Sequence, residues 1–112
     1  VTGGYRAIES MRLEKGYRSF GADLTYEHDP YEAGLDFAVK LDKGDFVGRT
    51  ALLERSQNVT RRLTCLTLDD DAAVVMGKEP VYSGGTCVGY VTSAAYGVGR
   101  SAKLVSPLAG QV

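Results

Sequence analysis

The chain has 112 residues, of which 44% are hydrophobic and 24% are charged, and its formal net charge is −1. These values are ordinary for one globular unit, and a nearly neutral chain lacks the positive charge that binding to nucleic acid or to an anionic membrane requires. We therefore expect neither as a partner, and no apolar run approaches the roughly 18 residues of a membrane span.

Residues 5–15 are expected to form a short amphipathic helix that ends at Gly16, a residue type favoured just after a helix C-terminus. Arg12 falls within the apolar arc of this helix, at about 100° per residue. A guanidinium on a buried face needs a partner. That partner is a carboxylate of a ligand or, as the structural alternative, Glu9 one turn earlier. The apolar arc itself consists of Tyr5, Ala7, Ile8 and Met11.

The segment after this helix is expected to be irregular as far as residue 31. Asp29-Pro30 then predicts an N-cap and a first helical residue, opening a brief turn that Gly34 stops. Alternating apolar and polar residues predict a strand over 35–41 with one buried face. A turn at 43–45 precedes a second helix, expected over 48–55 with Leu52 and Leu53 directed inward.

From Arg61 onward the pattern favours strands. Residues 62–68 predict the first strand, which three consecutive acids at 69–71 end. The dipeptide Gly84-Gly85 between two strand-like runs predicts a hairpin with a primed turn, whose second arm continues toward Tyr96. A glycine turn at 97–100 and a last strand at 100–105 follow. Several short strands joined by glycine-rich turns indicate a small antiparallel barrel or sandwich.

No catalytic or metal-ligating residue is predicted. Cys65 and Cys87 lack the spacing of metal ligands and are expected to be reduced thiols in the core. His28 is the only histidine, which argues against a multi-histidine metal site and against a histidine-activated nucleophile. The acids at 69–71 lack the alternating ligand spacing of a calcium loop.

Five ordered motifs carry a resemblance to a known family, namely residues 10–24, 30–35, 39–43, 45–52 and 62–66. The motif Ser10-Met11-Arg12-Leu13-Glu14-Lys15-Gly16-Tyr17-Arg18 resembles the folate-dependent aminomethyltransferase family, the glycine-cleavage T-protein. Its second half and residues 62–66 are most similar to the C-terminal folate-binding region of dimethylglycine and sarcosine dehydrogenases. Asp45 stands where the iron–sulfur-assembly and tRNA-linked branch has a cysteine, which argues against that branch.

The resemblance implies an α+β fold. Residues 1–56 would be short helices from the tail of a folate-binding domain, and residues 57–112 a small antiparallel β-barrel of the T-protein C-terminal type. Relatives have an aromatic-rich strand where this chain has Ala102-Lys103-Leu104-Val105-Ser106-Pro107. This difference puts the closing strand in question, and we expect the barrel to be incomplete.

The resemblance also implies a ligand. Arg12 matches a family arginine that contacts folate, and Tyr17 and Phe20 are candidates for walls around the pterin ring. The alternative for both aromatic rings is plain packing against the helix. Glu14 and Asp23 belong to the same motif, and we expect structural roles for both carboxylates.

The expected function is that of a C-terminal fragment of an enzyme that transfers one carbon from glycine or an N-methylglycine-type substrate to tetrahydrofolate. The fragment alone is not expected to be catalytically competent, because the family's aspartate lies in a preceding folate-binding body. That body, folate and a second copy through an open sheet edge are the expected partners, with FAD in a separate domain. The expected location is the bacterial cytoplasm or the mitochondrial matrix. The alternative is a non-catalytic interaction or regulatory module of the same family.

Overall fold

The computed structural model describes residues 3–70, 72–96 and 101–109. Its helical elements are α1 (Tyr5–Glu14), the 3₁₀ turn η1 (Asp36–Ala38) and α2 (Arg49–Gln57). Its strands are β1 (Arg61–Thr67), β2 (Pro80–Ser83), β3 (Thr86–Tyr96) and β4 (Ser101–Ala109). None of the helices in these ranges is long and apolar enough to cross a membrane. The glycine turn expected at 97–100 lies outside the described residues.

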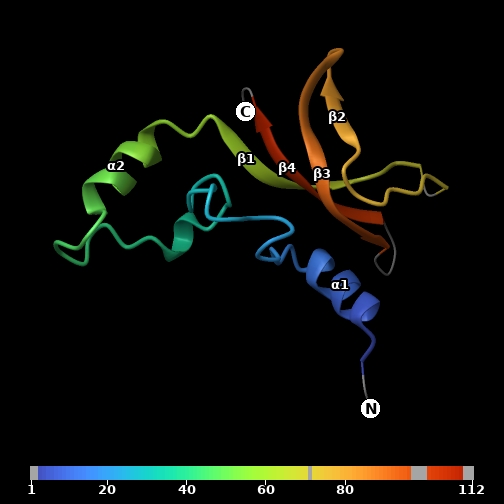
Figure 1. The fold of residues 1–112 in the computed structure, drawn as a ribbon, viewed down its shortest axis with the longest axis horizontal. Coiled ribbons are helices and arrows are strands. Elements are labelled where there is room, and N and C mark those ends of the chain that lie inside the picture. The colour runs from blue at the N-terminus through green and yellow to red at the C-terminus, as the bar shows by residue number, and fades with distance from the viewer. Residues whose placement is uncertain (1–2, 71, 97–100, 110–112) are drawn as a thin grey trace.

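The four strands form one antiparallel sheet in the order β1-β4-β3-β2 (Figure 1). The last strand in the sequence is therefore central: β4 pairs with β1 from Arg61↔Ala109 onward and with β3 from Val91↔Val105 onward. The expected antiparallel β domain is confirmed, with its sheet open at β1 and β2 among the described strands. The last strand, which the sequence put in question, is present and extends to Ala109.

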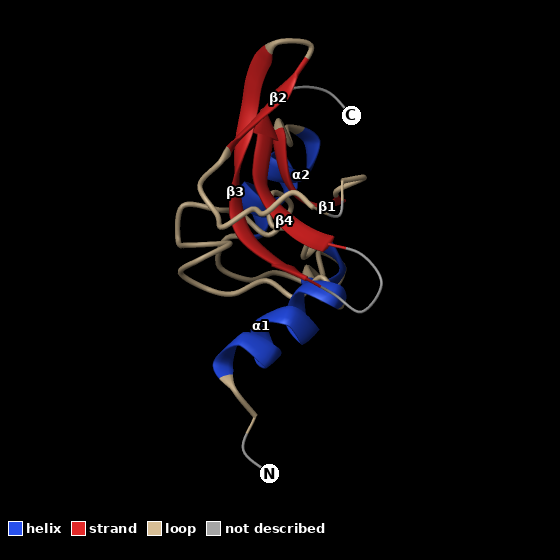
Figure 2. Ribbon diagram, turned by 90° about the vertical axis from the view of Figure 1, so that its right-hand side faces the viewer, coloured by secondary structure: helices blue, strands red, loops and turns tan. Residues whose placement is uncertain are grey.

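The predicted hairpin is also confirmed. Gly84 and Gly85 connect β2 to β3 with φ angles of 54° and 82°, and a primed turn requires positive φ at both central residues. Ser83 pairs with Thr86 on either side of this turn. The hairpin end projects beyond the rest of the sheet (Figure 2), so its side chains there have few neighbours.

Helix α1 ends as its sequence predicts. Gly16 adopts φ 68°, its N–H donates to the Leu13 carbonyl at 3.0 Å, and the Tyr17 N–H donates to the Arg12 carbonyl at 2.8 Å. This pair of bonds is the Schellman motif. The helix lies at one end of the sheet, beside β3 and β4 (Figures 1 and 2).

The face of α1 that contacts the sheet differs from the predicted one. Tyr5, Ile8 and Met11 are each more than half exposed, whereas Leu13 is buried and packs with Leu63. The sheet meets only the C-terminal half of this ten-residue helix. The apolar arc is therefore left largely exposed to solvent, and Leu13 is the apolar side chain of α1 that packs on the sheet.

The strand expected over 35–41 is wrong. Residues 36–38 form η1 instead, with the Ala38 N–H donating to the Leu35 carbonyl and the Val39 N–H to the Asp36 carbonyl, both at 3.0 Å. A strand needs a neighbouring strand for its backbone groups, and among the described strands none pairs with this segment. Phe37, expected to be buried, is exposed.

The second helix is confirmed as α2, which stands apart from the sheet (Figure 1). Of the two leucines expected to face inward, Leu52 is half-buried and Leu53 is exposed. Both cysteines are free thiols, but they are exposed rather than in the core. Cys65 lies on β1 two residues after Leu63, the residue against which Leu13 packs. Cys87 lies on β3 in the projecting hairpin.

The turn predicted at 29–34 is present and capped at both ends. The Asp29 carboxylate accepts the N–H groups of Tyr31 at 2.9 Å and Glu32 at 2.8 Å, and the Glu32 carboxylate accepts the Asp29 N–H at 3.1 Å. These reciprocal bonds form a capping box. Gly34 ends the turn with φ 64°.

We expect Gly34→Ala to lower the free energy of unfolding by about 1–2 kcal/mol, because a left-handed backbone carries that cost for a residue with a Cβ atom. The new Cβ would also lie 2.7 Å from Nη2 of Arg18. Gly44→Ala is the matched control, since Gly44 has φ 98° but open space around it. Urea unfolding of both variants measures the difference, and equal losses would mean that Arg18 moves aside freely.

Candidate functional site

Arg12 is the centre of a buried polar cluster. Its Nε and Nη2 donate to the two carboxylate oxygens of Glu9 at 3.1 and 2.5 Å. Its Nη1 donates to Asp23 at 2.6 Å and to the Tyr17 carbonyl at 3.1 Å, and Nη2 also donates to Ser93 Oγ at 2.9 Å. A guanidinium has five N–H donors, so each one has an acceptor. The Glu9 pair that the sequence offered as the structural alternative is present.

Asp23 is the buried carboxylate of this cluster. Its carboxylate is fully buried and accepts the Ser19 N–H at 2.8 Å and the Thr92 hydroxyl at 2.7 Å, besides Arg12. Burial pushes the pKa of Asp23 upward, but hydrogen bonds from Ser93, Thr92 and the Ser19 N–H, with the charge of Arg12, bring it below its usual 3.8. Asp23 is therefore ionised at neutral pH and ties the loop after α1 to β3.

Glu9, the second carboxylate on Arg12, is closer to solvent. Its side chain is 24% exposed, whereas that of Asp23 is 0% exposed. The hydrogen bond from Arg12 lowers the pKa of Glu9 below its usual 4.5, against the opposing effect of partial burial. The guanidinium is thus held by a fully buried carboxylate at Nη1 and by a partly exposed one at Nε and Nη2, where Nη2 is shared with the buried Ser93.

Tyr17 and Phe20 lie on the loop that encloses Arg12. Tyr17 is 65% and Phe20 is 59% exposed, so much of each residue is accessible to solvent. The Phe20 ring meets the Tyr26 ring edge-on, with centroids 4.9 Å apart. Tyr26 was missed in the sequence because no spacing rule connects it to Arg12. The loop therefore leaves aromatic faces accessible beside the cluster.

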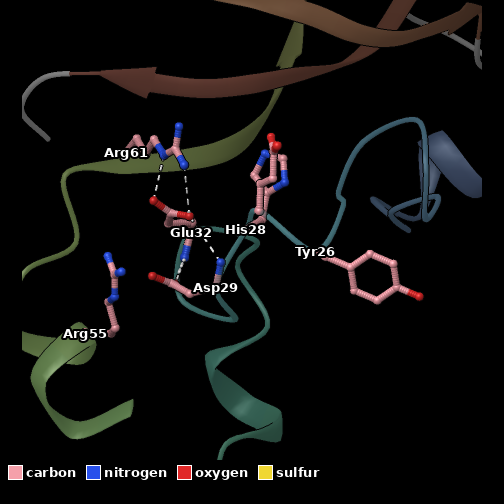
Figure 3. A pocket seen from close by; sticks show the side chains of 7 residues that line it. Tyr26, His28, Asp29, Glu32, Arg55 and Arg61 are labelled. Atoms are coloured by element: carbon pink, nitrogen blue, oxygen red, sulfur yellow. Dashed lines mark hydrogen bonds and ion pairs between the residues drawn. The ribbon is translucent and has the colours of Figure 1, made fainter. Parts of the chain in front are cut away.

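A second candidate site is an open pocket of about 260 Å³ between the 26–32 loop, α2 and β1 (Figure 3). Arg61 Nε donates to Glu32 at 2.6 Å, and the Asp29 carboxylate is used in the capping box. The Thr25 N–H donates to His28 Nδ1 at 3.0 Å. These groups bind one another, which makes the pocket the weaker candidate. It is lined by Tyr26, Glu27, His28, Asp29, Glu32, Arg55 and Arg61.

A metal site has no support in the described ranges. No group of three histidine, cysteine, aspartate or glutamate side chains there is arranged to hold an ion. Asp70, in the run of three acids, accepts the Ala72 N–H at 2.9 Å and so shapes a turn. Asp71 lies outside the described residues.

We expect the stability of the fold to fall in acid. The hydrogen bond from Arg12 lowers the pKa of Glu9 below 4.5. Burial raises the pKa of Glu32, but the hydrogen bonds from Arg61 and the Asp29 N–H, with the charge of Arg61, together bring it below 4.5, and the pKa of Asp23 lies below 3.8. A carboxylate with a lowered folded pKa contributes stability above its unfolded pKa and loses it as the pH falls through the folded value. The urea midpoint should be flat from about pH 7 to 5 and decline below about pH 4.5. A midpoint that stays constant to about pH 3 would contradict this.

Two family models match the chain. The GCVT N-terminal domain covers residues 1–43, and the glycine cleavage T-protein C-terminal barrel domain covers residues 61–102. Mitochondrial sarcosine dehydrogenase of Mus musculus is 43% identical over 87% of this chain, and mitochondrial dimethylglycine dehydrogenase of Rattus norvegicus is 40% identical over 83%. The chain spans 11% of the length of each of these relatives.

The likeness to solved structures also extends over most of the chain. The crystal structure of glycine cleavage system aminomethyltransferase T from Bartonella henselae has a TM-score of 0.78 and 28% sequence identity. The match covers 92% of this chain and 30% of that protein. The likeness therefore extends to the arrangement of α1 and the sheet.

Proposed function

Because the chain belongs to the glycine cleavage T-protein family, we propose that it is the C-terminal segment of a longer tetrahydrofolate-dependent enzyme. Residues 1–56 would end its folate-binding domain, and residues 57–112 would form its barrel domain. The proposed reaction moves a one-carbon unit from glycine or an N-methylglycine-type substrate to tetrahydrofolate, in the bacterial cytoplasm or the mitochondrial matrix. The likeness to sarcosine and dimethylglycine dehydrogenases favours FAD in a separate domain.

The observation that supports folate most directly is the environment of Arg12. Its guanidinium holds the Glu9 carboxylate through two planar, charged donors at the more exposed side of the cluster, and such donors suit a carboxylate or the polar edge of a pterin. The exposed rings of Tyr17 and Phe20 fit a flat heterocycle. When bound, tetrahydrofolate supplies the nitrogen that accepts the one-carbon unit. The described residues bind and orient it, and we assign none of them a catalytic role.

The exposed arc of α1 supports the existence of a further domain beside this chain. Tyr5, Ile8 and Met11 present apolar surface to solvent on α1, a helix whose C-terminus is closed by the Schellman motif. A contiguous exposed apolar patch marks a contact surface. We assign its cover to the N-terminal folate-binding body of the same enzyme.

Tetrahydrofolate titration by calorimetry tests the proposal. The protein encoded by the complete reading frame is expected to bind tetrahydrofolate with a saturable isotherm, and residues 1–112 alone are expected to bind it weakly at most. A stop codon directly before Val1, with no large domain encoded nearby, would exclude the proposal. So would a complete protein that binds no tetrahydrofolate.

A non-catalytic interaction module is the second candidate function. The edge of β1 is partly occupied, because the Leu63 N–H donates to the Glu32 carbonyl at 2.7 Å. Strand β2 is the other edge of the sheet, and an open edge can pair with another chain. Size-exclusion chromatography with light scattering should then show a dimer that dissociates on dilution. A monomer at every concentration would count against this function.

A further inference from the structure

The two carboxylates on Arg12 are bound differently. Glu9 takes both Nε and Nη2, in the parallel geometry with which arginine holds a planar pair of acceptors. Asp23 takes a single bond from Nη1. The remaining paired donors, Nη1 and Nη2, are divided between Asp23 and Ser93, so the Glu9 edge is the one at which a single planar group already takes two side-by-side donors.

The two carboxylates also differ in the cost of removing them from Arg12. Asp23 is fully buried and accepts hydrogen bonds from Ser19 and Thr92 besides Arg12, so its departure would break several hydrogen bonds at a buried site. Glu9 is partly exposed and is an i,i+3 neighbour of Arg12 on α1. The pair is partly buried, with Arg12 11% and Glu9 24% exposed, and a rotation of the Glu9 side chain returns its charge to water while the guanidinium keeps Asp23.

From this asymmetry we propose that the Glu9 carboxylate occupies the position on Arg12 that the ligand takes. The ligand binds Arg12 by displacing the Glu9 carboxylate, while Asp23 keeps the guanidinium in place. The inference rests on the proposed function, because folate supplies the acceptor pair. Folate carries such pairs in its glutamyl carboxylates and along the carbonyl edge of its pterin. Glu9 sets the affinity of the site, and Asp23 is a positioning residue that acts through Arg12.

The test compares tetrahydrofolate affinities of the complete protein by calorimetry. Glu9→Gln and Glu9→Ala are expected to lower the Kd about two- to fivefold, which is the range that loss of a weak competing ion pair allows. Glu54→Gln is the matched control, because Glu54 is an exposed carboxylate on α2. Its Kd should equal that of the wild type. In an Arg12→Ala background the Glu9 substitutions should have no effect, since the competition requires the guanidinium.

Two results would overturn the inference by itself: a Kd in both Glu9 variants that equals the wild-type value, or one that exceeds it. Melting temperatures of the same samples show whether each variant is folded. A wild-type protein that binds no tetrahydrofolate would instead remove the proposed function, and this inference with it. The two failures are therefore distinguishable in one set of titrations.

A second ligand separates the two sources of the acceptor pair. 6-Methyltetrahydropterin keeps the pterin and carries no carboxylate. If the gain from Glu9→Gln persists with this compound, the pterin edge replaces Glu9 on Arg12. If the gain occurs only with tetrahydrofolate, a glutamyl carboxylate replaces it. Either result supports displacement of Glu9 and assigns the group that takes its place.

Discussion

Asp23→Ala is expected to lower the free energy of unfolding by about 3–5 kcal/mol, the usual effect of removing one partner from a buried ion pair. The variant removes the acceptor of the Ser19 N–H and of one Nη1 N–H of Arg12, and it removes one hydrogen bond of the Thr92 hydroxyl. None of these donors reaches water easily at a site where the side chain is 0% exposed. Urea denaturation followed by circular dichroism measures the loss.

Two further variants provide reference values for this loss of stability. Asp45→Ala removes an exposed aspartate and should change stability by less than about 0.5 kcal/mol. Thr92→Val removes one hydrogen bond to Asp23 and should cost about 1 kcal/mol. A loss below about 1 kcal/mol in Asp23→Ala itself would show that the cluster contributes little to the fold.

Arg12→Ala is expected to raise the Kd of the complete protein for tetrahydrofolate roughly ten- to a hundredfold. A lost charge-assisted hydrogen bond costs on the order of 1.5–3 kcal/mol, which corresponds to that range. Flavin- or lipoamide-dependent steps should be largely unaffected, because the substitution removes a binding contact. Calorimetric titration of the wild type and the variant measures the ratio.

Controls are needed because Arg12→Ala also leaves the buried Asp23 without its charged partner and so lowers the free energy of unfolding. Arg6→Ala removes an exposed arginine from the same helix and should leave both the Kd and the melting temperature near their wild-type values. Arg12→Lys keeps the charge without the parallel donors, so its Kd should be intermediate. Equal tetrahydrofolate affinities in the wild type and Arg12→Ala would remove Arg12 from the site.

Local rules predicted those parts of the fold that local geometry determines. Gly16 ends α1, and Gly84 and Gly85 turn the hairpin, because each position requires a positive φ that glycine adopts without strain. The 29–34 turn follows in the same way from its cap and from Gly34. In each case the residues that decide the outcome are neighbours in the sequence.

Features that depend on distant contacts were not predictable in this way. The alternation at 35–41 resembles a strand but has no partner strand, and the sheet selected Leu13 rather than the apolar arc of α1. The helical position of Arg12 did indicate that it needs a partner, and Glu9 was within reach of a spacing rule. Ser93 lies on β3, where only the tertiary fold brings it to the guanidinium.

The position of β4 between β1 and β3 sets the order in which the sheet can assemble. The β2–β3 hairpin can form as soon as it is synthesised, because its contacts are local. Strand β1 precedes the hairpin, but among the described strands it pairs with β4 alone. Arg61 therefore cannot pair until Ala109 has been synthesised. Until β4 has been added, the hairpin and β1 each have an unpaired strand edge, to which chaperones or other chains can bind. On the ribosome, residues 101–109 are therefore the last part of the sheet to be made, and they join strands that until then are connected through α1 and the loop after it.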